Sequence, residues 1–326
     1  MMKKFKKAVM VYDDVGGHYN VGDYVQSLAA QGFVGKPDYY INRERASKFS
    51  EENAKLIMNG WFTHTKNNSW IPSEKIDPLF VAFHINSNAV DSILSKEGIS
   101  YLKKHQPIGC RDINTLKLLE SVGIKAYFSG CLTLTLDRYK KENIERKGIY
   151  IVDPLYNYPQ SKYMFSSMKQ AIKGVIKGDI LKLNKLDNHL SKIFTKELLC
   201  NAHYECQVLP SQGVSHDRRF EHANNLLEKY STAELVITSR IHCALPCLAM
   251  GTPVIYVNGF DNFVDTCRFE GILDLFNRID VDPKSGKFKT NFDFSGSKID
   301  KDVKIVNKND YLRLADDMKE ICLKFI

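Results

Sequence analysis

The chain has 326 residues, and its 46 lysines and arginines exceed its 38 aspartates and glutamates to give a formal net charge of +8. With 44% hydrophobic and 26% charged residues, the composition is that of an ordinary globular protein, which excludes wholesale disorder and a mini-protein that needs staples to fold. The positive charge admits an anionic partner, and nucleic acid, an anionic membrane and a phosphorylated small substrate all stay open.

The N-terminal segment is basic and then apolar, as the start of a signal peptide would be. Its apolar run 8–12 is shorter than the apolar region of a signal peptide, and Asp13 and Asp14 follow it at once. We interpret the run as a first buried strand. No stretch of about 18 apolar residues occurs, so we expect no membrane span. The eight cysteines lie mostly in apolar segments, so we expect a cytoplasmic protein.

Short apolar runs alternate with helical patterns in the first part of the chain. The predicted strands are 7–12, 38–41, 55–58, 79–84, 107–110 and 125–128, and the predicted helices are 23–33, 97–105 and 112–122. This alternation is typical of a parallel sheet with helices on both faces. In the last of these helices, Asp112 is suited to the N-cap and Gly123 to the end, with Leu119 among the apolar residues at helical spacing between them.

The most charge-dense stretch, 137–147, lacks a clear apolar face and is interpreted as a linker between two domains. At roughly 150 residues per domain, the length also suggests two domains. A second alternating block begins at Gly148. Its predicted strands are 148–152, 206–209, 234–238 and 253–257, and its predicted helices are 165–176, 179–194, 217–230, 240–250 and a final amphipathic helix at 309–325.

Two features of the second block can be interpreted either as purely structural or as functional. Helix 179–194 is basic and amphipathic, and could lie on an anionic membrane, but a surface helix that packs one face on its own domain is favoured. Cys200, His203 and Cys206 have a spacing that could suit a metal. Because no fourth ligand follows at a regular offset, we expect no metal there.

The first candidate site is the glycine-rich segment 16–23, between the first predicted strand and its helix. Glycine lets the backbone turn sharply and approach a ligand closely, and the helix N-terminus offers amide groups to an anion. The candidate residues are Asn20, Gly22 and Asp23. The spacing matches neither the dinucleotide fingerprint nor the phosphate loop of NTPases, and a purely structural turn is an equal alternative.

The second candidate site is the start of helix 240–250, directly after an apolar strand. Ser239, Arg240 and His242 stand where open α/β sheets bind ligands, at the carboxyl end of a parallel strand. Arginine supplies a permanent, planar cation for phosphate or carboxylate, and histidine exchanges protons near neutral pH. The alternative is that Arg240 pairs with an acid and that His242 caps backbone.

Arg111 and Asp112 form a third candidate at the end of strand 107–110, where a local ion pair is an equal alternative. His84, after the fourth strand, and His216, before helix 217–230, are weaker candidates, since lone residues of this kind are more often structural.

Taken together, these motifs resemble the polysaccharide pyruvyl transferase family. The resemblance rests on Asn20-x-Gly22-Asp23, Arg111-Asp112, the run 129–136, Ser239-Arg240-Ile241-His242 and Gly251-Thr252-Pro253. It covers about residues 14–258, and the Ser-Arg-Ile-His block is its most specific part. Segments 155–205 and 260–326 carry no family motif. Many members have leucine and glycine around the histidine, where this chain has Ile241 and Cys243.

The resemblance implies two Rossmann-like domains that face a cleft, similar to B-type glycosyltransferases. The expected bounds are 1–145 for an N-terminal, acceptor-side domain, 146–308 for a C-terminal, phosphoenolpyruvate-side domain, and 309–326 for a helix that packs back on the first. It also implies transfer of pyruvate from phosphoenolpyruvate onto a sugar as a ketal, with no metal or cofactor. The acceptor would belong to a surface-polysaccharide precursor, plausibly a lipid-linked oligosaccharide at the inner membrane surface, and no nucleic acid is expected.

By position, the family's arginine and histidine fall on Arg240 and His242, and its first-domain Arg-Asp pair falls on Arg111 and Asp112. Phosphoenolpyruvate carries about three negative charges, so two arginines from opposite domains suit it. A protonated His242 is the expected general acid, and Asp112 or Asp23 the expected proton acceptor. The remaining residues assigned to substrate binding are Asn20, Gly22, Ser239, His84 and His216.

Two other functions compete with this interpretation. A B-type glycosyltransferase that uses a nucleotide sugar would have the same fold class, and Arg240 and His242 could hold its diphosphate. A non-catalytic glycan-binding scaffold is the alternative from another class, although a decayed site would not be expected to keep Arg111, Arg240 and His242 together.

Overall fold

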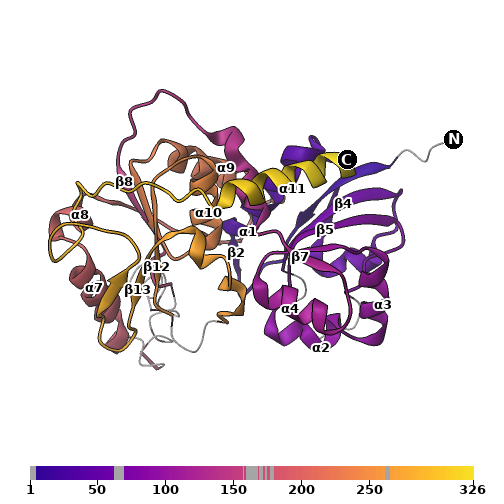
Figure 1. The fold of residues 1–326 in the computed structure, drawn as a ribbon, viewed down its shortest axis with the longest axis horizontal. Helices are drawn as coiled ribbons and strands as arrows, with labels where there is room; N and C mark the ends of the chain where they lie inside the picture. Colours follow the sequence, from indigo (N-terminus) through magenta and orange to yellow (C-terminus); the bar gives the residue numbers. More distant parts are fainter. Residues whose placement is uncertain are drawn as a thin grey trace.

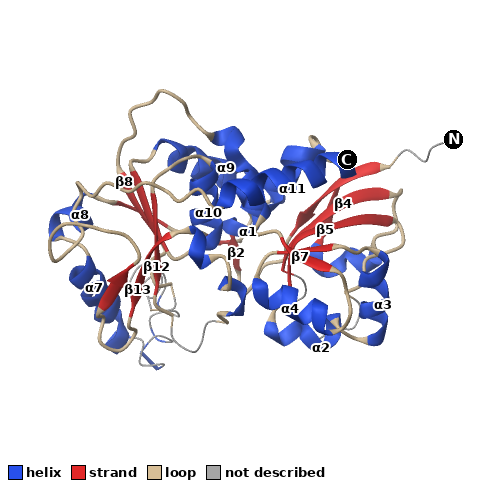
Figure 2. Cartoon of the chain, in the orientation of Figure 1, coloured by secondary structure: helices blue, strands red, loops and turns tan. Residues whose placement is uncertain are grey.

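Two six-stranded sheets stand on either side of a layer of helices (Figure 1). The computed structural model describes residues 5–61, 70–156, 180–260 and 265–326, together with the single positions 158, 168, 172, 175 and 176. The predicted helix 165–176 lies largely outside these residues. The predicted α/β class is confirmed, because strands and helices alternate along both parts of the chain (Figure 2).

The first sheet comes from the first part of the chain, and all its strands run parallel. Its strands, in spatial order, are β3 (Tyr39–Asn42), β1 (Lys6–Val11), β4 (Ala54–Trp61), β5 (Ile76–His84), β6 (Ile108–Cys110) and β7 (Ala126–Phe128). In β1, residues 8–11 are all buried, because elements cover both faces of the sheet. The predicted strands of this region are therefore present, with bounds that shift by up to three residues.

Three helices flank this sheet where the sequence predicts them: α1 (Val21–Val34), α3 (Lys96–Lys104) and α4 (Ile113–Ser121). The structure adds the short α2 (Val90–Ile93) and the 3₁₀ turns η1 (Arg43–Lys48) and η2 (Ser87–Ala89), which the sequence did not predict. In α4, the Asp112 carboxylate accepts a hydrogen bond from Thr115 N at 2.8 Å, which confirms the predicted N-cap. Gly123 follows with a φ of +73°, the left-handed conformation that ends a helix.

The second sheet is parallel except for the edge strand β14, which runs antiparallel to its neighbour β13. Its strands, in spatial order, are β14 (Phe288–Thr290), β13 (Asn277–Val281), β12 (Val254–Asn258), β11 (Leu235–Thr238), β8 (Ile149–Val152) and β9 (His203–Glu205). Its helices are α7 (Ile180–Ile193), α8 (Lys196–Asn201), α9 (His216–Thr232) and α10 (Ile241–Ala249), and its 3₁₀ turns are η4 (Cys267–Phe269) and η5 (Leu273–Leu275). Strands β13 and β14 lie in the segment where the sequence offers no motif.

The basic helix α7 packs on its own sheet. Leu186, Leu190 and Ile193 are buried in a cluster with apolar residues of the second sheet, and Lys192 Nζ donates to the backbone oxygen of Ser285 at 2.6 Å. The described part of α7 thus supports the favoured interpretation, a surface helix with one face on its own sheet. Within the described ranges, no helix is both long and apolar enough to cross a membrane.

One predicted strand, 206–209, is wrong. The chain leaves the second sheet after Glu205, and β10 (Val208–Pro210) pairs antiparallel with β2 (His18–Asn20) from the first part of the chain. The cause is a set of polar contacts between residues far apart in the sequence. Asp153 Oδ2 accepts from Gln207 N at 2.9 Å, and Gln207 O accepts from Val21 N at 2.7 Å, so residue 207 is held between the two sheets. A small ladder therefore links the two parts of the chain.

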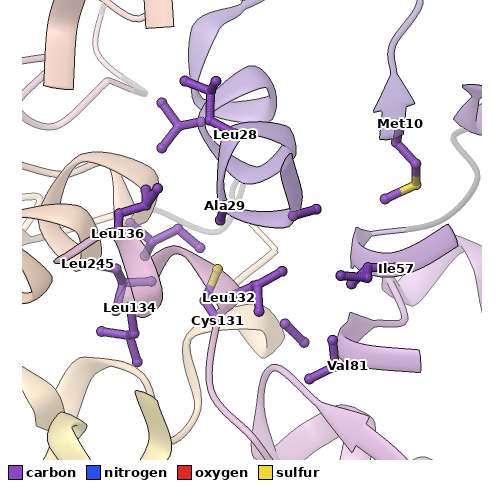
Figure 3. Packing of buried hydrophobic residues seen from close by; sticks show 14 of the residues in the cluster. Met10, Leu28, Ala29, Ile57, Val81, Cys131, Leu132, Leu134, Leu136 and Leu245 are labelled. Atoms are coloured by element: carbon purple, nitrogen blue, oxygen red, sulfur yellow. The ribbon is translucent and has the colours of Figure 1, made fainter. Parts of the chain in front are cut away.

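The layer between the sheets is apolar and continuous. Leu28 and Ala29 of α1 lie near the leucines of the 3₁₀ helix η3 (Leu132–Tyr139) and near Leu245 of α10 (Figure 3). The same buried cluster extends into β1, β4 and β5 on one side and into α9 on the other. The predicted linker 137–147 is thus partly wrong, because it begins inside η3, whose Tyr139 is buried and donates to Asn224 on α9.

The last helix, α11 (Tyr311–Phe325), returns to the first part of the chain (Figure 1). Met318 and Cys322 join the continuous cluster, Lys319 Nζ lies 2.8 Å from Asp137 Oδ2, and Lys55 donates to the backbone oxygen of Phe325. The domain bounds 1–145, 146–308 and 309–326 stay predictions.

Replacing Arg146 with alanine should lower the free energy of unfolding by about 3 kcal/mol, because one guanidinium holds several carbonyl oxygens. Its Nη1 donates to Ser231 O at 2.7 Å and its Nη2 to Met250 O at 3.2 Å, which ties the ends of α9 and α10 together. Denaturant unfolding checks this. The matched control is the neighbouring Lys147→Ala, whose exposed pair with Glu145 should contribute little. Equal effects of the two variants would contradict the assigned role.

Candidate active site

A cavity of about 330 Å³ lies between the two parts of the chain, beside the β2–β10 ladder. This volume is at the lower end of small-molecule sites. The first part of the chain contributes Asp13, Val15, His18, Tyr19, Asn20, Asp23, Gln26, Arg43 and Arg111, and the second part contributes Tyr156, Gln207, Val208, Ser239, Arg240, Ile241, His242, Arg268 and Phe269. The two strongest sequence candidates, Arg240 and His242, therefore share one cavity with Arg111.

Arg240 is held at the end of β11 by its backbone and by its side chain. Its amide N donates to Thr238 Oγ1 at 2.9 Å, and its Nε donates to Asp153 Oδ2 at 3.0 Å. Its guanidinium carbon lies 4.0 Å from the centre of the Tyr156 ring, so the cation stacks on an aromatic face. These contacts use Nε and one face of the guanidinium, and among the residues that the structure describes they leave its two terminal nitrogens for a ligand.

Arg111 is a buried cation with little to compensate it. Its side chain is 2% exposed, and within the described parts of the chain its Nε and Nη2 have no hydrogen-bond partner. The nearest carboxylate oxygen, Asp112 Oδ2, is 4.0 Å from Nε, which is too far for a hydrogen bond. A buried charge without partners is costly, so a cavity lined by this guanidinium is suited to an anion.

Arg268 is a third arginine of the cavity, and the sequence offered no motif for it. It lies on η4, which follows Asp265, whose carboxylate accepts from Ser87 N and Asn86 Nδ2 at 3.2 Å each. These hydrogen bonds hold the segment around η4, in the second part of the chain, against residues 86 and 87 of the first part. Arg268 Nη2 donates to the Tyr156 hydroxyl, while its Nε is buried without a partner among the described residues. Tyr156 therefore organises two arginines, Arg240 through its ring and Arg268 through its oxygen.

Other residues of the site were missed as well. Asp153, which holds Arg240, follows β8 directly and Tyr156 lies in the same loop, so the strand-end argument that selected Arg240 could have selected them too. Gln207 and Arg43 could not have been found, because the first is positioned by the unexpected ladder and the second lies in a 3₁₀ turn without a motif.

His242 lies in the first turn of α10 against α1. A Cβ added to Gly22 would lie 3.1 Å from the His242 Cβ, and Gln207 Nε2 donates to the His242 backbone oxygen at 3.4 Å. The ring atom Nε2 is buried and has no partner within the described residues. Burial, followed by the charges of Arg111 and other arginines, holds the pKa of His242 well below its usual 6.5. The ring is therefore neutral at pH 7 in this structure, which differs from the protonated state expected from the sequence.

Asp23 is a half-buried carboxylate of the cavity. It lies in the first turn of α1, which Asn20 caps by accepting from Gly22 N at 3.0 Å, and Gln26 Nε2 donates to it at 3.3 Å. Burial raises its pKa above the usual value, although the charges of Arg43 and other arginines act in the opposite direction. A carboxylate with a raised pKa inside a cavity is suited to accept a proton.

Several predicted site residues are not brought to the cavity. The Asp112 side chain is 0% exposed and bonds to His84 Nδ1 at 2.6 Å, and neither residue lines the cavity. The structure thus corrects the expectation that Asp112 takes a proton from a substrate, because no substrate atom can reach it. His216 lies outside the cavity and bonds to the Tyr24 hydroxyl at 2.7 Å. Ser239 lines the cavity, but backbone groups engage its hydroxyl, with Val257 O at 2.5 Å.

Gly22→Ala should lower kcat by about 10-fold to 100-fold without lowering the melting temperature, because a small displacement of a catalytic side chain is expensive. The new Cβ would lie 3.1 Å from the His242 Cβ and 3.1 Å from Gln207 Oε1, which is tighter than ordinary van der Waals contact, so we expect His242 to shift by a few tenths of an ångström. Alanine itself is favourable in a helix. Steady-state kinetics with a thermal melt check this, and an unchanged kcat would contradict the close approach.

The described residues contain no group of three histidine, cysteine, aspartate or glutamate side chains placed to hold a metal ion. Cys206 Sγ instead donates to the backbone oxygen of Val208 at 3.4 Å.

Comparison with known proteins gives one family match. The family model described as "Polysaccharide pyruvyl transferase" matches residues 20–262, about three quarters of the chain. No curated protein sequence matches significantly. Among solved structures, a functionally uncharacterized protein from Klebsiella pneumoniae subsp. pneumoniae is similar at 13% identity, over 80% of this chain and 87% of that one, with a TM-score of 0.41.

Proposed function

The chain belongs to the polysaccharide pyruvyl transferase family, and from this premise we propose that it moves the pyruvyl group of phosphoenolpyruvate onto a sugar of a surface-polysaccharide precursor as a ketal. The observation that carries the proposal is the buried Arg111 guanidinium, whose Nε and Nη2 lack hydrogen-bond partners among the described residues and which shares its cavity with Arg240 and Arg268. Arg43 also lines the cavity, where it pairs with Glu44, and the other three arginines match the phosphate and carboxylate of one small trianion.

In the proposed binding mode, the arginines divide the donor between the two parts of the chain. Arg111 extends from the end of β6, while Arg240 and Arg268 are held by Tyr156. Arg240 precedes α10, whose N-terminal amide groups favour a phosphate. Lysine would lose the bond to Asp153 and the stacking on Tyr156, so an arginine is required there.

In the proposed reaction, a proton is added to the methylene carbon of the donor, and the electron pair of the C=C bond forms the new C–H bond. The central carbon becomes electrophilic and is attacked by one sugar hydroxyl. Phosphate then leaves, which breaks the bond between the central carbon and the phosphate ester oxygen. A second hydroxyl of the same sugar attacks the same carbon and completes the ketal. Of the two hydroxyl protons, one balances the new methyl hydrogen and the other leaves with phosphate.

His242 is the proposed proton donor, although it is neutral in this structure. The charges of the arginines contribute to its low pKa, and a trianionic donor between them would offset those charges. Donor binding would thus raise the pKa of His242 and let the ring take up the proton that it then delivers. Asp23, whose pKa burial raises, is the proposed acceptor of a hydroxyl proton.

The proposed acceptor is plausibly a lipid-linked oligosaccharide, modified at the cytoplasmic face of the membrane. The direct test incubates the protein with phosphoenolpyruvate and a set of galactosides and mannosides. We expect phosphate release that needs both substrates, and a product heavier than the acceptor by pyruvate less one water. A panel of nucleotide sugars serves as the comparison in thermal-shift measurements. Stabilisation by a nucleotide sugar and none by phosphoenolpyruvate would contradict the proposal and favour a glycosyltransferase.

A further inference from the structure

Next to the cavity, the buried side chains of His84, Asp112 and Arg111 lie in a row of contacts. The proposed reaction does not fully explain this arrangement. His84 ends β5 and Asp112 precedes α4, and both side chains are 0% exposed with His84 Nδ1 2.6 Å from Asp112 Oδ2. The same carboxylate oxygen lies 4.0 Å from Arg111 Nε, while its second oxygen accepts from Thr115 N at 2.8 Å. Each Asp112 oxygen therefore accepts one hydrogen bond, from His84 or from the helix that it caps, and the carboxylate is close to Arg111 without a hydrogen bond to it.

The protonation states of this chain follow from its burial. Burial, followed by the charge of Arg111, lowers the pKa of His84 to about 4, so its ring is neutral at pH 7. Burial alone would raise the pKa of Asp112, but the hydrogen bond from His84 and the neighbouring charges lower it. An ionised carboxylate only accepts hydrogen bonds, so the proton of the neutral ring must be on Nδ1. His84 is then a neutral donor that satisfies a buried anion without adding a charge.

We propose that His84 is a positioning residue that occupies Asp112 and thereby keeps the Arg111 guanidinium out of a hydrogen bond to that carboxylate and available to the anionic donor. Arg111 and His84 compete for the same carboxylate oxygen, and His84 holds it at 2.6 Å while Arg111 remains at 4.0 Å. This inference rests on the proposed function for the identity of the donor. The competition itself does not depend on which anion the cavity takes.

The physical reason is the high cost of a buried carboxylate oxygen without a donor. If His84 could not donate, Asp112 Oδ2 would be left unsatisfied, with Arg111 Nε as the nearest cation. Arg111 has two nitrogens without hydrogen-bond partners among the described residues, and a shift of about 1 Å would turn the 4.0 Å contact into a hydrogen-bonded ion pair. An arginine in such a pair would have to break it before it could bind the donor.

Three variants test this mechanism. His84→Leu removes the donor with an apolar side chain, and His84→Asn keeps an amide N–H at the position of Nδ1. The double variant His84→Leu/Asp112→Asn removes the competing negative charge, while asparagine preserves the N-cap of α4. Binding of phosphoenolpyruvate and of inorganic phosphate is measured by isothermal titration calorimetry, and folding is checked by thermal melts.

We expect His84→Leu to weaken binding of phosphoenolpyruvate by about tenfold or more, and His84→Asn to stay near the wild-type affinity. The double variant should recover most of the loss, which a merely structural role of His84 would not produce. In turnover, His84→Leu should raise KM for the donor far more than it lowers kcat.

The outcomes separate this inference from the proposed function. If the wild type binds phosphoenolpyruvate and the double variant is as weak as His84→Leu, or if His84→Leu binds normally, the role of His84 is overturned and the function stands. If the wild type binds phosphate but not phosphoenolpyruvate, and His84→Leu binds phosphate weakly with rescue by Asp112→Asn, the donor is overturned and the role of His84 stands. Binding of neither anion by the wild type overturns both.

Discussion

His242→Gln should lower kcat by about 10²-fold to 10⁴-fold and leave the affinity for phosphoenolpyruvate within a few-fold of the wild type. Glutamine keeps a polar side chain of similar reach but cannot deliver a proton at neutral pH. The ring contacts no described partner through Nε2, so its loss should not disturb the arginines that hold the donor. Single-turnover kinetics and donor titration separate the two effects.

The matched control is His203→Gln, at an exposed histidine of β9 that does not line the cavity, and it should leave kcat unchanged. Near-normal turnover by His242→Gln would contradict its role as proton donor. Loss of donor affinity with unchanged kcat would instead assign His242 to binding.

The same histidine predicts how donor binding depends on pH. Its pKa is well below 6.5 in this structure and should rise when the donor is bound, so the complex holds more protons than the free protein between those two pKa values. The donor should therefore bind with proton uptake, and more tightly as the pH falls through that window. Calorimetry in buffers of different ionisation enthalpy measures the uptake. The donor's own phosphate titrates in both proteins, so the difference between wild type and His242→Gln isolates the ring.

Arg111→Met should weaken phosphoenolpyruvate binding by about 10²-fold or more, which would be the largest affinity loss among the arginine variants. Methionine fills similar space but lacks the buried positive charge, so one end of the donor would lose its partner. Donor titration by calorimetry checks this. The matched control is Arg313→Met on α11, where the arginine is 91% exposed and removal of the same charge should leave donor affinity unchanged.

Equal effects of these two arginine variants would mean that the overall +8 charge, rather than the cavity, attracts the donor. If Arg111→Met leaves the affinity for phosphoenolpyruvate unchanged, Arg111 stabilises the fold and does not bind the donor. The formal charge of the chain thus says little about donor binding, whereas the positions of Arg111, Arg240 and Arg268 in the cavity indicate where an anion binds.

The α/β class and most strands and helices could be predicted because apolar runs and caps are local signals. Asp112 and Gly123 mark the bounds of α4 in the sequence and in the structure alike. Strand 206–209 failed because its pairing depends on the Asp153–Gln207 hydrogen bond, a contact between segments that the sequence cannot connect.

The candidate site could be predicted where a strand end and a helix start coincide with a charged residue, as at Arg240 and Arg111. Arg268 could not be predicted, because it reaches the cavity through contacts of Asp265 with residues 86 and 87 of the other part. Asp112 was misassigned for a related reason. Its type and position suit a base, but only the three-dimensional packing reveals that His84 and α4 enclose it.

The continuous apolar layer of α1, η3, α9 and α10 has a consequence for how the chain unfolds. Since one buried cluster extends across both parts, neither sheet can lose its packing without exposing apolar surface of the other. The two parts should thus melt together in one cooperative transition, not as two independent units. Because the cavity sits at this shared boundary, a bound anion would shift that single transition as a whole, so one melting curve reports on the entire molecule.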